Sequence, residues 1–507
     1  MTASHEPEPD ASVLSARVFP RLYRDSVTLM ALASTVEQAD GVLRVGAVMA
    51  TPANLEILSR SGMCPPDLQA APDDLILAVR ATDETALQAA LAAAEAGLQG
   101  TDAGVAGLGQ PLPGTLHEAF STHPDSTLVT ISTPGTYAPV VVEQALRAGR
   151  HVFCFSDNVG IEDEVRLKQL AVERGLLLMG PDCGTSVLDG IPLGFANVVR
   201  RGPVGIVSAS GTGAQEVACL LHRAGSGVSQ IVGVGGRDLS TAVNGLMTHH
   251  ALDMIVEDPD TQVVVVVSKP PAPEVAKALL AHLAELGKPA VACLLGLDDA
   301  DGPVPVRGTL DGGARAASAL VGQALESLDL GLDADLPGAG SLRPGGLVCG
   351  LFAGGTLAAE AKHVLRRARI AAEIIDLGDD QYTAGRPHPM IDPTLRAEEV
   401  ARCGDRTDVA VVLVDLVLGH GASPDPAGPL ARAIRTAQDL AASQGFVLPV
   451  VASVCGTDLD PQGLAGQVAV LRDAGAFIAP SAAAAARMAA ALLRPTVGAG
   501  AGAEVES

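Results

Sequence analysis

The chain contains two copies of one glycine-rich strand–turn–helix pattern. The first copy, Val204–Ala218, reads VGIVSASGTGAQEVA, and the second, Leu347–Ala361, reads LVCGLFAGGTLAAEA. Gly211-Thr212 in the first copy aligns with Gly355-Thr356 in the second. Because an apolar strand, a turn of small residues and a helix recur in the same order, the pattern predicts a duplicated α/β domain.

Further matches downstream support the duplication. They follow in the same order: Glu216 with Glu360, Val263–Val267 with Val409–Val414, and Pro289–Gly296 with Pro449–Gly456. A single match of this kind is weak evidence, but an ordered series indicates that the whole domain has been copied.

The two glycine turns are predicted to bind an anion. The first backbone N–H groups of a helix have no intrahelical partner, and the helix dipole places partial positive charge there. Glycines let the backbone approach an anion, and Ser or Thr hydroxyls add donors. The predicted phosphate-binding residues are Ser208, Ser210, Gly211, Thr212, Gly213, Gly354, Gly355 and Thr356. Two such helix ends facing each other would hold a phosphoryl or acyl-phosphate group. A tight turn without a ligand is the alternative for either loop alone.

Composition agrees with parallel sheets covered by helices. Hydrophobic residues make up 48% of the chain, but there is no Trp and there are only three Tyr and eight Phe. The cores must therefore be built from Ala, Val, Leu and Ile, which is typical of parallel sheets buried on both faces. The fold class expected is α/β, with several doubly wound parallel-sheet domains: a Rossmann-like domain, two flavodoxin-like domains and a small N-terminal α/β domain.

Alternating strands and helices divide the 507 residues into four expected domains. These are a small N-terminal α/β domain (13–98), a Rossmann-like domain (126–200), and the two repeated domains (202–327 and 347–494). The segment Leu330–Gly346, rich in Gly, Pro and Asp, is the expected linker between the repeats.

The charge of the chain excludes some classes of function. A net charge of −24 argues against nucleic acid and anionic membrane surfaces as partners, since both attract Lys and Arg. No apolar run is long enough to span a membrane and the N-terminus has no apolar signal core, so a soluble cytoplasmic protein is expected. The eight cysteines are scattered without a CxxC pair, so no metal site is assigned.

A polar insert in the second repeat is the candidate substrate site. The segment Tyr382–Arg396 follows a predicted strand, and ligands of open parallel sheets bind at the carboxyl ends of strands. We expect Arg386 and Arg396, with Arg237 of the first repeat, to hold a carboxylate, and His388 to move a proton. The alternative is an ordered loop whose Arg–Asp pairs only hold it together.

Several segments together resemble the FdrA family, which is itself similar to succinyl-CoA synthetase and other acyl-CoA ligases. They are FSDNVGIEDEVRLKQLA, MGPDCGTS, SASGTGAQE, GGRDLS, SKPPAPE, AGGTLAAEA, DLGDD and GRPHPMIDPTLR. The resemblance implies that 127–200 corresponds to a CoA-binding-type domain and that the repeats correspond to the ligase domains of the α and β subunits. It also implies a loop site for substrate or CoA at Asp157, Asn158, Asp182, Cys183 and Gly184.

The chain departs from the synthetase where that enzyme relays phosphate through a histidine. The matching stretch, Leu295–Gly308, has no histidine, and a lysine-containing segment, Ser268-Lys269-Pro270, stands where a supporting glutamate would lie. No ATP-grasp segment is recognisable. The resemblance therefore implies direct transfer between an acyl or carbamoyl phosphate and a small acceptor.

Within the FdrA family, the implied activity is that of an oxamate carbamoyltransferase of purine (allantoin) breakdown. It interconverts oxalurate plus phosphate with oxamate plus carbamoyl phosphate in a multi-subunit assembly. An acyl-CoA synthetase with its nucleotide-binding half on another chain is the first alternative, and a non-catalytic scaffold is the second. The expected partners are a small carboxylic acid, phosphate or an acyl phosphate, and further protein subunits. No cofactor is assigned; CoA and carbamoyl phosphate stay open as substrates, and a homo-oligomer stays open as the assembly.

Overall fold

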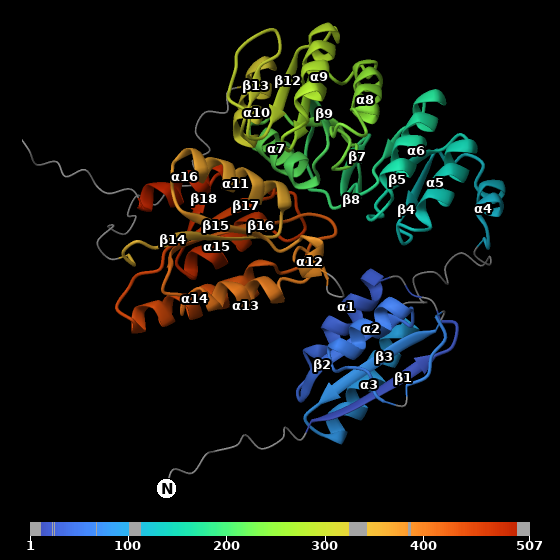
Figure 1. Cartoon of the computed structure of the whole chain (residues 1–507), viewed down its shortest axis with the longest axis vertical. Helices are drawn as coiled ribbons and strands as arrows, with labels where there is room; N and C mark the ends of the chain where they lie inside the picture. The colour runs from blue at the N-terminus through green and yellow to red at the C-terminus, as the bar shows by residue number, and fades with distance from the viewer. Residues whose placement is uncertain are drawn as a thin grey trace, which may run out of the picture. The chain divides into compact units, whose positions relative to one another are not determined.

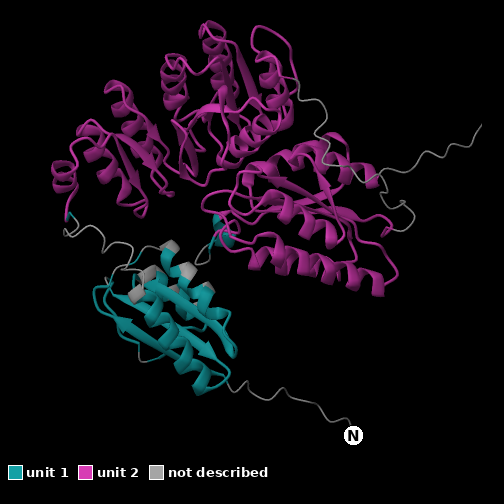
Figure 2. Cartoon of the chain, turned by 180° about the vertical axis from the view of Figure 1, so that it is seen from behind, with its two compact units in different colours: residues 1–113, 380–387 teal, residues 114–379, 388–507 magenta. Residues whose placement is uncertain are grey.

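The structure is a computed structural model. It describes residues 12–22, 24, 26–66, 68–72, 74–100, 113–323, 342–383 and 387–493. Contacts divide the chain into two compact units, residues 1–113 with 380–387, and residues 114–379 with 388–507 (Figure 2). The second unit thus takes in three of the four domains expected from the sequence, whose boundaries stay predictions. Among the described residues, no helix is long and apolar enough to cross a membrane.

The first unit is built on a small antiparallel sheet with strand order β1-β3-β2. Its strands are β1 (Val13–Phe19), β2 (Val42–Met49) and β3 (Leu75–Ala81), and its helices are α1 (Ser26–Glu37), α2 (Pro52–Arg60), α3 (Glu84–Gly100) and the short α12 (Asp380–Thr383). The central strand β3 is almost wholly buried, and apolar clusters pack on both of its faces. The small α/β domain expected at the N-terminus is confirmed.

The second unit begins with a small parallel sheet of order β4-β5-β6 (Figure 1). Its elements are α4 (Leu116–Thr122), β4 (Leu128–Ile131), α5 (Ala138–Arg147), β5 (His151–Cys154), α6 (Ile161–Glu173) and β6 (Leu178–Met179). The hairpin β7 (Thr185–Leu188) and β8 (Ile191–Gly194) then leaves this sheet, and β7 pairs antiparallel with β10 of the next one. The hairpin covers an edge that would otherwise present unpaired backbone groups.

The two repeats form the remaining sheets. The first repeat contains β9 (Arg201–Ser208), α7 (Gly211–Arg223), β10 (Val228–Gly233), α8 (Leu246–Val256), β11 (Val263–Ser268), α9 (Pro273–Glu285), β12 (Ala290–Leu294), β13 (Val306–Arg307) and α10 (Leu310–Leu320). The second contains β14 (Leu347–Phe352), α11 (Gly355–Arg367), β15 (Ala372–Asp376), α13 (Thr394–Arg402), β16 (Val409–Val417), α14 (Ala427–Ser443), β17 (Val450–Cys455), α15 (Leu464–Asp473), β18 (Ala476–Ala479) and α16 (Ala482–Leu493).

Both repeats have the same winding. The strands run β10-β9-β11-β12-β13 in the first repeat and β15-β14-β16-β17-β18 in the second, all parallel. In each sheet the first strand of the repeat lies between the second and the third, which is the flavodoxin-like order. The central strands β11 and β16 are buried along their whole length, as expected for sheets covered by helices on both faces. The expected α/β class is confirmed.

The repeats share one core, and a glutamate of each repeat accepts a hydrogen bond from the other. A single apolar cluster takes in β9, α7 and α10 of the first repeat together with β14, α11 and α16 of the second. Glu216 on α7 accepts a hydrogen bond from the backbone N of Ala482 at 3.1 Å, and Glu360 on α11 accepts one from the backbone N of Leu310 at 2.6 Å. The aligned glutamates of the duplication thus each cap the last helix of the other repeat.

Candidate functional site

The first glycine loop is fixed by its own serines. Ser210 is the N-cap of α7, and its Oγ accepts a hydrogen bond from the backbone N of Gly213 at 2.9 Å. The backbone N of Ser210 donates to Ser208 Oγ at 3.0 Å. Both serines are buried. The hydroxyls therefore set the direction in which the first amides of α7 point.

The N-termini of α7 and α11 meet. Ser210 Oγ lies 2.5 Å from Thr356 Oγ1, although the two residues belong to different repeats. Thr356 is buried in the first turn of α11. The expectation that the two duplicated loops converge is confirmed, whereas their binding of phosphate stays a prediction.

The second glycine loop is held by a buried carboxylate. Gly354, the N-cap of α11, has no side chain, and Asp415 on β16 accepts from the backbone N of Ala353 and of Gly354, each at 2.8 Å. Arg396 on α13 donates to Asp415 Oδ1 at 2.7 Å and to the Asp415 carbonyl at 2.7 Å. Both side chains are buried, so the guanidinium neutralises the acid that shapes the loop.

An acid and a lysine lie beside the first residue of α11. A Cβ placed on Gly355 would lie 2.3 Å from Asp376 Oδ2 and 3.5 Å from Lys269 Nζ, so only glycine fits here. Asp376 ends β15, and Lys269 follows β11 of the other repeat. Burial raises the pKa of Asp376, and the Lys269 charge opposes that shift. The two repeats thus both contribute charged groups to this helix end.

His388 lies next to the second glycine loop. A Cβ on Gly378 would lie 2.5 Å from His388 Nε2 and 3.0 Å from the Ala353 carbonyl oxygen. Burial, with a smaller contribution from the Arg396 charge, lowers the pKa of His388 to about 4. His388 Nδ1 accepts from the backbone N of Met390 at 3.2 Å. At neutral pH the ring is therefore uncharged, and this hydrogen bond assigns its proton to Nε2.

The contacts of the described residues do not bring together the arginines that are predicted to hold a carboxylate. Arg396 pairs with Asp415, and Arg237 Nη2 pairs with Glu164 Oε2 at 2.7 Å and donates to the Val159 carbonyl at 2.8 Å. Arg386 lies outside the described residues. The role of the three arginines in binding a carboxylate stays a prediction, but Arg237 and Arg396 each have an internal acid as partner.

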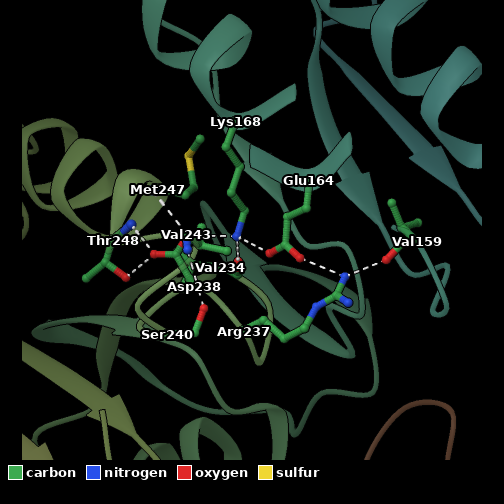
Figure 3. A network of polar contacts seen from close by, with 10 residues as sticks. All are labelled: Val159, Glu164, Lys168, Val234, Arg237, Asp238, Ser240, Val243, Met247 and Thr248. Atoms are coloured by element: carbon green, nitrogen blue, oxygen red, sulfur yellow. Dashed lines mark hydrogen bonds and ion pairs between the residues drawn. The ribbon is translucent and has the colours of Figure 1, made fainter. Parts of the chain in front are cut away.

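Arg237 belongs to a buried ionic network that joins α6 to the first repeat (Figure 3). Lys168 Nζ donates to Glu164 Oε1 at 2.8 Å, to Asp238 Oδ1 at 2.7 Å and to the Val234 carbonyl at 2.8 Å. Asp238 Oδ2 in turn accepts from Thr248 N at 2.8 Å and Thr248 Oγ1 at 2.6 Å in the first turn of α8. Both Lys168 and Asp238 are fully buried.

The loop implied to bind substrate or CoA contains both exposed and buried residues. Asp157, Asn158 and Asp182 are exposed, and Gly184 is half-buried. Cys183 is buried, and burial raises the pKa of its thiol to about 11, so it is no ready nucleophile. The following residue, Thr185, reaches the first glycine loop, because a Cβ on Gly211 would lie 3.1 Å from Thr185 Oγ1. The implied binding role of the loop stays a prediction.

Sequence reasoning missed Asp415 and the Lys168 network as parts of the site. Asp415 had a signal, because it is the one acid in the apolar run VAVVLVDLV of β16. Lys168 had a weaker signal, since Glu164 precedes it by one helical turn within IEDEVRLKQLAVE. Nothing in the sequence indicated that Asp238 would close the same network.

Three family models match parts of the chain. A CoA-ligase model matches residues 351–492, a CoA-binding-domain model matches residues 199–295, and a model described as AllF, heavy metal-associated domain, matches residues 12–110. The CoA-binding match falls on the first repeat, whereas the sequence resemblance assigned that role to 127–200. The CoA-ligase match coincides with the second repeat.

Curated relatives cover different shares of the chain. YahF of Escherichia coli (strain K12) is 38% identical over 496 residues, covering 91% of this chain and 95% of YahF. The α subunit of malate–CoA ligase from Methylorubrum extorquens is 27% identical, covering 37% of this chain and 65% of its own length. The α subunit of ADP-forming succinate–CoA ligase from Aquifex aeolicus is 28% identical, covering 37% of this chain and 62% of its own length.

Among solved structures, the dinucleotide-forming acetyl-coenzyme A synthetase 1 of Ca. Korarchaeum cryptofilum in its apo form aligns with 72% of this chain and 82% of its own. Sequence identity is 16%, with a TM-score of 0.31.

The residues of the N-terminal domain do not fit a heavy-metal site. Residues 12–110 contain one cysteine, Cys64, and no histidine. Within the described ranges, no group of three or more His, Cys, Asp or Glu side chains is placed to hold a metal ion. Soft metals are held by several thiolate or imidazole ligands, so no step of the chemistry is assigned to a metal here.

Proposed function

This chain belongs to the FdrA family, within the succinyl-CoA-synthetase-like superfamily, and on that premise we propose that it is a subunit of an acyl-CoA-ligase-type enzyme. In this proposal α7 and α11 hold the phosphoryl group of an acyl phosphate between their N-termini. The contact of Ser210 Oγ with Thr356 Oγ1 at 2.5 Å carries the proposal, because it brings two helix N-termini to one point.

Some backbone amides of this site bind an internal carboxylate, and the proposal assigns others to the ligand. Asp415 already occupies the amides of Ala353 and Gly354. The phosphoryl oxygens would therefore bind the next amides of α11, at Gly355 and Thr356, and the first amides of α7. Both sets lie at the positive ends of helix dipoles, and their geometry is fixed before the ligand arrives.

The charged groups beside Gly355 support a site for a transferring phosphoryl group. Lys269 Nζ supplies a positive charge at this point in a chain whose net charge is −24. Burial raises the pKa of Asp376, while the nearby Lys269 charge opposes that shift, so the carboxyl and the lysine together set the charge beside the proposed phosphoryl group. Arg396 acts indirectly, by holding the Asp415 carboxylate that shapes the loop.

Transfer between carbamoyl phosphate and a small acid such as oxamate is the second candidate. The observation that favours it is the absence of histidine from Leu295–Gly308, where a synthetase of the succinyl-CoA type carries its phosphohistidine. Direct attack of an acceptor on a bound carbamoyl phosphate needs no phosphoenzyme, only positioning and charge stabilisation.

Calorimetry on the full chain distinguishes these candidates. Phosphate, carbamoyl phosphate, oxamate and CoA are each titrated alone and then in pairs. Saturable binding of phosphate and CoA supports the ligase-type function, whereas binding of oxamate and carbamoyl phosphate without CoA supports carbamoyl transfer. Failure of the wild-type chain to bind any phosphate-containing ligand contradicts both and favours a scaffold.

A further inference from the structure

Two cysteines far apart in the sequence lie together inside the second repeat. Cys349 is in β14, and Cys403 follows the last residue of α13. Their Sγ atoms are 3.7 Å apart, within reach of an S–H···S hydrogen bond, and both residues are buried. Cys403 Sγ is also 3.4 Å from the carbonyl oxygen of Glu399, one helical turn earlier.

One arginine contacts this pair, and a second binds the backbone beside it. Arg406 Nη1 lies 3.7 Å from Cys349 Sγ, and the Arg406 side chain, 34% exposed, extends from the thiols towards the surface. It is held there by Glu373 at 2.6 Å and by Asp408 at 2.7 Å. The buried Arg343 donates from Nη2 to the Gly404 carbonyl at 2.6 Å and from Nη1 to the Cys403 carbonyl at 3.5 Å. A cation beside a thiol favours the ionised, reactive form of that thiol.

We propose that Cys349 and Cys403 form a redox-active dithiol that closes to a disulfide when the protein meets a peroxide. The Cys403 thiolate attacks one peroxide oxygen, the O–O bond breaks, and the leaving oxygen takes a proton to give water and a sulfenic acid. The Cys349 sulfur then attacks the Cys403 sulfur, the S–O bond breaks, and a second water leaves. Two thiols are oxidised and one peroxide is reduced, so no further reactant is needed.

The two thiols, which share a hydrogen bond, have different roles in the proposal. That bond lowers the pKa of Cys403 and, together with burial, raises the pKa of Cys349, while the Arg406 charge acts against the rise at Cys349. The proposal accordingly assigns Cys403 as the attacking thiol and Cys349 as the resolving one, and the Cys349→Ser variant below tests this order.

The chain contains a matched pair of cysteines in a different setting. Cys219 on α7 and Cys455 at the end of β17 have Sγ atoms 4.0 Å apart and are also buried. There the hydrogen bond with Cys219, burial and the nearby Glu216 carboxylate raise the pKa of Cys455 well above its ordinary value. Proximity alone predicts oxidation of both pairs at similar rates, whereas the proposal predicts that Cys349 and Cys403 are oxidised first.

Peptide mapping of the folded full chain tests the proposal. The protein is treated with hydrogen peroxide, remaining thiols are alkylated, and disulfide-linked peptides are identified without reduction by mass spectrometry. We expect a Cys349–Cys403 link to form before any Cys219–Cys455 link. Recovery of both thiols in reduced form, or equal rates at the two pairs, would overturn the proposal.

Two variants, with Arg402→Gln as a control, test the roles of individual residues. Arg406→Gln should slow the link by about tenfold, as expected for a thiolate population reduced by about one pKa unit, while Arg402→Gln on the exposed face of α13 should leave it unchanged. Cys349→Ser should stop at the sulfenic acid on Cys403, which dimedone labels. Absence of label on Cys403 in this variant, with circular dichroism showing a folded chain, also contradicts the proposal.

Discussion

Ser210 Oγ and Thr356 Oγ1 lie 2.5 Å apart, and each belongs to the first turn or cap of a helix that opens one of the two repeats. This contact joins the two copies of the duplicated loop at a single point. It also gives the proposed phosphate site its most direct test.

Replacing Thr356 by valine should weaken phosphate binding. Valine keeps the shape of threonine but leaves Ser210 Oγ without this partner and removes a donor next to the proposed phosphoryl group. Thr356→Ser retains the hydroxyl and should bind nearly as the wild type does. Loss of one hydrogen bond to a charged group corresponds to about 1.5–3 kcal/mol of binding free energy, measured by calorimetry. Equal affinities for the valine and serine variants would contradict a role for the hydroxyl.

Removal of Arg396 should destabilise the second repeat strongly. In Arg396→Met the buried Asp415 keeps its charge but loses its cation, at a cost of about 3–5 kcal/mol in the free energy of unfolding. The double variant Arg396→Met, Asp415→Leu removes both charges and should recover part of this loss. Urea denaturation measures the free energy of unfolding of the single and the double variant. A double variant less stable than the single one would show that the carboxylate matters more for capping the loop than for its pairing.

Glu216 and Glu360, which each accept a hydrogen bond from the other repeat, should make the free energy of unfolding depend on pH. Burial raises the pKa of both Glu216 and Glu360, so the folded protein holds protons that the unfolded chain releases. Their contribution is therefore fully present below the ordinary glutamate pKa of 4.5 and is lost as pH rises towards the raised folded pKa. Glu360→Gln keeps an acceptor for the Leu310 amide without an ionisable proton. Denaturation across a pH series should show a smaller loss of stability with rising pH in this variant, and identical slopes would contradict the assignment.

Removing the cation of Lys168 should lower the free energy of unfolding far more than removing a cation from a surface ion pair of the same spacing. Lys168→Met leaves the buried Asp238 without a cation and Glu164 with only the partly exposed Arg237, and we expect a loss of about 3–5 kcal/mol in the free energy of unfolding. Arg147 also pairs with an acid one helical turn earlier, Glu143, but its side chain is mostly exposed. Arg147→Ala should cost less than about 1 kcal/mol. Similar unfolding midpoints for the two variants would mean that the buried network contributes little.

The sequence predicted the architecture well because the signals for it are local. The alternation of buried strands with helices, and the repeated glycine turns, follow from short segments whose periodicity can be read directly. The recurrence of SGT and GGT even predicted that two helix ends would converge, which the Ser210–Thr356 contact confirms. The hairpin β7–β8 falls within the expected domain 126–200, but its antiparallel pairing with β10 depends on a sheet edge that no local pattern reveals.

The partners of charged residues could not be predicted from local sequence patterns. Arg237 and Arg396 were interpreted as substrate ligands because they occur in polar loops at the ends of strands. Their acids, Glu164 and Asp415, lie in other elements and reach them only through the fold. A sequence shows that a charge is present, but its partner is decided by the packing of segments that are distant along the chain.

The glutamates at aligned positions 216 and 360, each reaching into the opposite repeat, have a consequence for the separated halves of the chain. A reciprocal exchange of this kind is what an isologous interface between identical subunits looks like. A separated half would need a second molecule to bind the N-terminus of its last helix. The two halves of the chain therefore meet as two copies of one subunit would, and cutting the chain between them should yield fragments that associate with each other.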